Sequence, residues 1–105
     1  MHVGMARRAP DPTSSVEISL RLALSRQALG YTQATMARLM GSATAGQAFA
    51  NYESGLRRIS LDHAIKLHQT CGLTLEWIYL GQMHNLPQDL RSKIQELLPP
   101  HKRTG

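Results

Sequence analysis

The sequence predicts a single all-α domain built from short helices. Gly or Pro residues recur at short distances along the 105-residue chain, and most intervals between them begin with a Ser or Thr that can cap a helix. Apolar residues within the intervals recur three or four positions apart, the spacing of one helix face, and no window shows sustained β alternation. With 42% hydrophobic residues, a chain of this length can close one modest core.

The first helix is expected over residues 15–29. Ser14, followed three positions later by Glu17, is a capping-box start, and Gly30 can adopt the left-handed conformation that ends many helices. Apolar residues at helical spacing lie between them: Ile18, Leu22 and Leu29. Thr32 can cap a second helix that ends at Gly41.

The third helix is expected to begin near Thr44 and to end before Gly55. Thr44 and Gln47 form a box-like start, and Phe49 and Tyr52 are its bulky residues.

Two helices follow, one capped by Ser60 and stopped at Gly72, the other opened by Thr74 and closed by Gly81. The five helices together predict a compact domain.

A sixth helix is expected from about Pro87 to the break at Pro99-Pro100. It carries an apolar stripe of Leu86, Leu90, Ile94, Leu97 and Leu98. This stripe can pack on its own domain, on a dimer mate or on another protein.

The chain therefore divides into four segments. These are a disordered N-terminal arm over 1–13, the five-helix domain over 14–82, the C-terminal helix over 83–98 as a dimerisation element, and a basic tail over 99–105.

The charge balance favours a polyanionic partner. Twelve Lys/Arg residues against seven Asp/Glu residues give a formal charge of +5 and a pI near 10. Ribosomal, membrane-surface and merely soluble proteins can be basic too. The single cysteine, Cys71, excludes an intrachain disulfide and suits a reducing cytoplasm. There is no apolar run like a membrane span or a secretory signal, so we expect a soluble, cytoplasmic protein with no membrane contact.

Neither an enzyme nor a cofactor or metal site is expected. His63 and His68 are five positions apart, off the four-residue spacing of metal pairs on a helix. No nucleophile elbow or Cys/His pairing is present either.

A set of residues over 18–81 resembles the phage-repressor (XRE/Cro-type) family. The matching residues are Leu22, Arg26, Gly30-Tyr31-Thr32-Gln33, Ala37, Gly41, Tyr52-Glu53-Ser54-Gly55, Ser60, Gly72 and Leu75-Glu76-Trp77-Ile78. The resemblance implies a lambda-repressor-like helix-turn-helix domain that binds double-stranded DNA. The expected function is a sequence-specific transcriptional regulator that acts as a homodimer on a near-palindromic operator.

The third helix is the expected reading helix. Gln47 and Asn51 lie four positions apart on one face, whereas Phe49 and Tyr52 lie on another. Asn and Gln side chains can bind adenine edges, so Gln47 and Asn51 are the expected base readers, together with Gly46, where the family often has a polar reader.

Other residues are expected to contact the DNA backbone. The resemblance places Gln33 there, and Thr32 and Thr44 lie at helix starts, which attract phosphate. Arg57 and Arg58 follow the reading helix and can bind phosphates without reading sequence.

The resemblance also implies that Glu53 pairs with Arg26 in a partly buried ion pair. Removal of one partner from such a pair costs about 3–5 kcal/mol. The chain departs from the family by two additional residues between Gly41 and Glu53, so Ser42-Ala43 should lengthen the turn before the reading helix.

A second function remains open from the sequence. An antitoxin or other protein-interaction module could use residues 86–98 to bind a partner protein.

Overall fold

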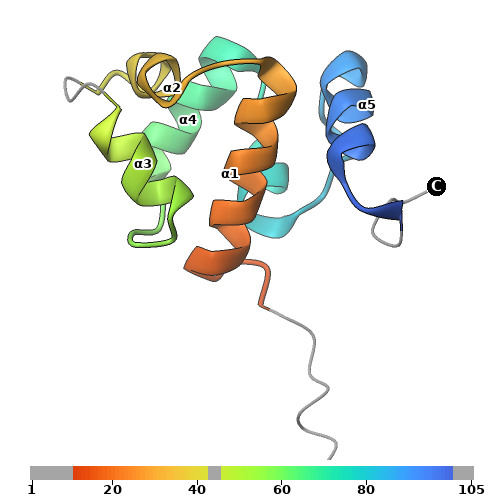
Figure 1. Ribbon diagram of the computed structural model, residues 1–105, viewed down its shortest axis with the longest axis horizontal. Coiled ribbons are helices and arrows are strands. Elements are labelled where there is room, and N and C mark those ends of the chain that lie inside the picture. The colour runs from red at the N-terminus through yellow and green to blue at the C-terminus, as the bar shows by residue number, and fades with distance from the viewer. Residues whose placement is uncertain (1–10, 43–45, 101–105) are drawn as a thin grey trace, which may run out of the picture.

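The computed structural model describes residues 11–42 and 46–100, which form five α-helices and one π-helical turn without a strand (Figure 1). In chain order the elements are α1 (Ser15–Leu29), α2 (Gln33–Leu39), α3 (Gln47–Glu53), α4 (Leu61–Cys71), η2 (Glu76–Leu80) and α5 (Gln88–Leu97). The predicted all-α fold with a C-terminal helix is confirmed. No helix in this part of the chain is both long enough and apolar enough to cross a membrane.

Side-chain caps start three of the helices where the sequence predicts them. The hydroxyl of Ser14 accepts the Glu17 N–H at 3.2 Å, Thr32 accepts that of Thr35 at 3.1 Å, and Ser60 caps α4 in the same way. These bonds satisfy backbone donors that have no partner within the helix. Local sequence therefore fixes the starts of α1, α2 and α4.

The helices enclose one core, with α1 at its centre. In Figure 1, α1 lies between α3 and α5, and it packs against both and against η2. The second helix packs on α3 and α4. The fully buried large apolar side chains come from every layer: Ile18, Leu22, Met36, Met40, Phe49, Leu67, Leu73, Ile78 and Ile94.

A buried polar chain ties α1 to η2. The indole N–H of Trp77 donates to Ser25 Oγ at 2.8 Å, and Ser25 donates in turn to the Arg21 carbonyl at 2.7 Å. Arg21 Nε donates to the Ile78 carbonyl at 3.0 Å. Burial lowers the pKa of Arg21 below its usual value, and the guanidinium meets carbonyl groups that can compensate its charge.

Residues 11–13 differ from the disordered arm expected over 1–13. The Asp11 carboxylate accepts from the backbone N–H and the hydroxyl of Thr13, at 2.8 and 2.7 Å. The Arg21 guanidinium also donates to the Pro12 carbonyl. The rest of that arm, and residues 101–105 of the basic tail, lie outside the described residues.

Most of the apolar stripe of α5 is used within the domain. Leu86, Leu90 and Ile94 belong to the core, and α5 packs along α1. Leu97, in contrast, is 44% exposed. The C-terminal helix is thus a layer of the same domain, and it offers less apolar surface to a partner than the sequence suggested.

Two substitutions on α5 test this packing. Ile94→Ala should lower the free energy of unfolding by about 2–5 kcal/mol, because it leaves a cavity in the core. Leu97→Ala is the matched control, and it should change stability by roughly 1 kcal/mol or less because the side chain is already exposed to solvent over part of its surface. Urea unfolding measures both. Equal, small effects would mean that α5 is not part of the core.

Candidate nucleic-acid interface

The third helix has one packed face and one open face. Phe49 is completely buried and Tyr52 is 8% exposed, so these side chains anchor α3 in the core. Gln47 is exposed and Asn51 is half-buried, on the face that points away from it. The difference follows from the helical period, because residues four apart share a face. Gln47 and Asn51, two of the three expected base readers, therefore lie at the surface.

The two amides are bonded to each other. Gln47 Nε2 donates to Asn51 Oδ1 at 3.1 Å. Both residues line a shallow surface depression that also includes Ala48, Tyr52 and Arg57. The depression therefore combines two amide side chains with one cation, and its other side chains are small or packed.

Gly46 is the third residue expected to read bases, and its surroundings differ from those of Gln47 and Asn51. The residue is buried, and a Cβ at this position would lie 3.3 Å from the backbone N of Ala34 in α2. Its φ of +92° is also unsuited to other residues. Gly46 instead lets the backbone leading into α3 approach α2 closely.

The predicted start of the third helix near Thr44 is wrong. The helix begins at Gln47, with Gly46 as its N-cap and no side-chain capping bond. The left-handed conformation of Gly46 interrupts the helical path that a start at Thr44 would need. Residues 40–46 separate α2 from α3 in the sequence, and residues 43–45, which include Ala43 and Thr44, lie outside the described residues.

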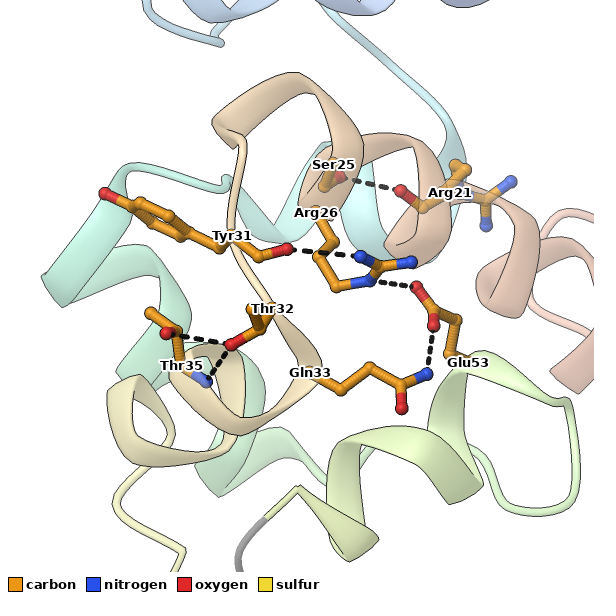
Figure 2. A network of polar contacts seen from close by, with 8 residues as sticks. All are labelled: Arg21, Ser25, Arg26, Tyr31, Thr32, Gln33, Thr35 and Glu53. Carbon is orange, nitrogen blue, oxygen red and sulfur yellow. Dashed lines mark hydrogen bonds and ion pairs between the residues drawn. The ribbon is translucent and has the colours of Figure 1, made fainter.

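Glu53 joins three helices through one carboxylate. Its Oε2 lies 2.8 Å from Arg26 Nε of α1, forming the ion pair that the family pattern implies. Its Oε1 accepts a hydrogen bond from the Gln33 amide of α2 (Figure 2). The side chain of Glu53 is 10% exposed and that of Arg26 is 24% exposed. The single acid of α3 therefore has both oxygens engaged inside the fold.

Sequence reasoning missed the bond between Gln33 and Glu53. The family pattern places Gln33 only at the DNA backbone, and that contact stays a prediction. The bond to Glu53 is compatible with it, because an amide nitrogen carries two donor hydrogens. The missed signal was the carboxylate itself, which has two oxygens and needs more than one donor when buried. Arg26 also donates to the Tyr31 carbonyl at 3.1 Å, which ties the turn after α1 to the same network (Figure 2).

The other predicted backbone contacts lie at the surface. Thr32 is exposed, and its hydroxyl is occupied as the cap of α2 and as a donor to Thr35 at 3.1 Å. Arg57 and Arg58 are exposed in the loop after α3. The backbone N–H of Arg57 donates to the Asn51 carbonyl at 3.2 Å, which holds the start of this loop against α3.

Loss of the Glu53 carboxylate should destabilise the domain. Glu53→Ala leaves Arg26 without its ionic partner and Gln33 without an acceptor. Because the pair is partly exposed, we expect a loss of about 2–3 kcal/mol, between the values for exposed and buried pairs. Thermal melting measures it. Asp62→Ala, which removes an exposed acid from the first turn of α4, is the control; a melt that matches this control would contradict the bridging role of Glu53.

The close approach at Gly46 gives a second stability test. Gly46→Ala and Gly41→Ala both place a side chain on left-handed backbone, at φ +92° and +80°, which costs roughly 1–2 kcal/mol. Only Gly46 has α2 backbone within van der Waals contact of the added Cβ, while Gly41 has open space. Urea titration should therefore show a larger loss for Gly46→Ala. Equal losses would show that the close approach to Ala34 does not contribute to the cost of the substitution.

Comparison with known proteins agrees with this architecture. A family described as Helix-turn-helix, of the XRE type, matches residues 22–78, which is more than half of the chain. The matched residues run from the middle of α1 into η2 and include the complete α2 and α3. No curated protein and no solved structure matched the chain. The chain belongs to the XRE-type helix-turn-helix family of DNA-binding regulatory domains.

Proposed function

We propose that this protein is a sequence-specific transcriptional regulator that binds DNA as a homodimer on a near-palindromic operator. The observation that carries the proposal is the open face of α3, where Gln47 and Asn51 stand beside Arg57. Amide side chains read base edges, and a neighbouring cation suits the flanking phosphates.

The composition of α3 favours entry into a major groove. Groove width is about 12 Å, so small outward residues let a helix seat deeply. Ala48 and Ala50 are small, and Gln47 and Asn51 carry no charge. The one acid, Glu53, is engaged by Arg26 and Gln33, so it presents little repulsion to phosphates.

Backbone contacts would surround this face. Arg57 and Arg58 are exposed directly after α3, and Thr32 and Gln33 lie at the start of α2. Thr44 completes the proposed set through the turn before α3. These residues would supply affinity and register, and the two amides would supply sequence preference.

A second copy is proposed because α3 is short. Its seven residues extend only about 10 Å, enough to span a few base pairs. Two copies related by a two-fold axis would place their reading helices about 34 Å apart, one turn of DNA, and would double the sequence that is read.

The alternative, a module that binds a partner protein through residues 86–98, has less support. Leu86, Leu90 and Ile94 are buried in the core. Leu97 is the one exposed member of that stripe among the described residues, at 44%. The observations therefore favour DNA binding by the face of α3.

Selection of binding sites from random duplexes tests the proposed function. The purified protein should enrich a near-palindromic sequence with half-sites about 34 Å apart. Its affinity for that sequence should fall steeply as salt is raised, since phosphate contacts release counterions. Enrichment of a single half-site would contradict binding as a homodimer. No enrichment of any sequence would contradict sequence-specific binding.

Readers and backbone contacts should respond differently to substitution. Arg57→Ala should weaken binding to all duplexes alike and reduce the slope of log affinity against log salt by about one. Gln47→Ala should relax the preference at one base pair by roughly 1–3 kcal/mol and leave the slope nearly unchanged. Gel shifts over a salt series measure both quantities. The same response from both variants would contradict the division of roles.

A further inference from the structure

We infer that a polar depression between α5 and the loop before it binds a small polar molecule that carries a carboxylate or phosphate group, with Arg91 as the residue that holds this group. The depression lies on the far side of α1 from α3 (Figure 1). It is therefore separate from the face of α3 that is proposed to contact DNA, and it adds a second binding activity to the protein.

Two parts of the chain form the walls of the depression. Residues 81–84, which follow η2, form one wall. The other wall is a single face of α5, since its lining residues lie three or four positions apart: Gln88, Arg91, Ser92 and Gln95. The volume between the walls is about 590 Å³, within the range of roughly 300–1,000 Å³ that is typical of small-molecule sites.

Buried residues hold both walls in place. Leu90 and Ile94, on another face of α5, belong to the core and fix the orientation of the helix. In the loop, Leu86 is buried and its N–H donates to the Met83 carbonyl at 3.1 Å. The depression therefore exists without a ligand, and binding requires little ordering of the chain.

The lining of the depression offers hydrogen-bond donors and contains no carboxylate. The Arg91 guanidinium carries a permanent positive charge and can donate two parallel bonds to a carboxylate or a phosphate. Around it, the side chains of His84, Gln88 and Ser92 can each donate a further bond. This set of groups matches an anion with polar substituents, and it does not match a cation or a purely apolar molecule.

Arg91 differs from the other arginines that are partly withdrawn from water. Among the described residues, the buried or half-buried arginines are Arg21, Arg26 and Arg91. Arg21 donates to two carbonyl groups, and Arg26 donates to Glu53 and to a carbonyl group. The side chain of Arg91 makes no hydrogen bond or ion pair with the part of the chain that the structure describes. An anionic ligand would compensate its reduced hydration, so Arg91 can contribute strongly to binding.

Titration of the full chain with inorganic phosphate and, separately, with succinate tests the site. The NMR signals of the Arg91 side chain and of the Gly81 backbone should shift to saturation with at least one of these anions, which also identifies the preferred group. Arg91→Ala should weaken that binding by roughly 10- to 150-fold, because it removes a charged hydrogen-bond donor. Arg91→Lys should weaken it less, because it keeps the charge and loses the planar fork.

Lys93→Ala is the matched control, because Lys93 is a cation of the same helix that lines a different depression. It should leave the affinity for both anions unchanged. An equal loss from Lys93→Ala and Arg91→Ala would overturn the inference, since it would indicate general attraction of anions to a basic chain. The absence of a saturable shift at Arg91 with both anions, up to roughly 10 mM, would overturn it as well. Thermal melts verify that each variant is folded, and the selection of DNA sites tests the function of α3 independently.

Discussion

The placement of α3 in the fold depends on one carboxylate. Glu53 ends α3, and its two oxygens bind Arg26 of α1 and Gln33 of α2 (Figure 2). A helix of seven residues has little stability of its own, so its orientation must come from such contacts and from the packing of Phe49 and Tyr52. The carboxylate sets one end of α3, and Gly46, packed against α2, sets the other.

Within two helical turns, α3 separates the side chains that hold it in the fold from the side chains of its open face. The charged and aromatic residues of α3 face inward and hold it, which leaves an outer face of small and amide side chains. Arg57 lies next to that face because its backbone bonds to the Asn51 carbonyl. The outer residues of α3 can therefore vary without disturbing the contacts that hold the helix.

Local signals were sufficient to predict most of the fold. Ser14, Thr32 and Ser60 cap helices where the sequence places them, because a cap depends only on residues three positions away. The start of α3 could not be predicted in this way. Thr44 and Gln47 look like a local start, but the contact between Gly46 and Ala34 of α2, which sequence spacing does not reveal, moves the start to Gln47.

The same limit applies to the site. The family pattern supplied the pairing of Arg26 with Glu53, and helical spacing put Gln47 and Asn51 on one face. The bond from Gln33 and the contact between Trp77 and Ser25 join residues distant in sequence, so no periodicity could indicate them. Donor and acceptor counting at buried polar groups is the reasoning that could have found both.

The proposal that Gln47 and Asn51 of α3 contact DNA is tested most directly by their side-chain amide signals in an NMR titration. On addition of the selected operator, the amide resonances of Gln47 and Asn51 should shift together, while that of the α5 residue Gln88 stays in place. Shifts confined to other parts of the protein, with both α3 amides unmoved in a tight complex, would contradict the account.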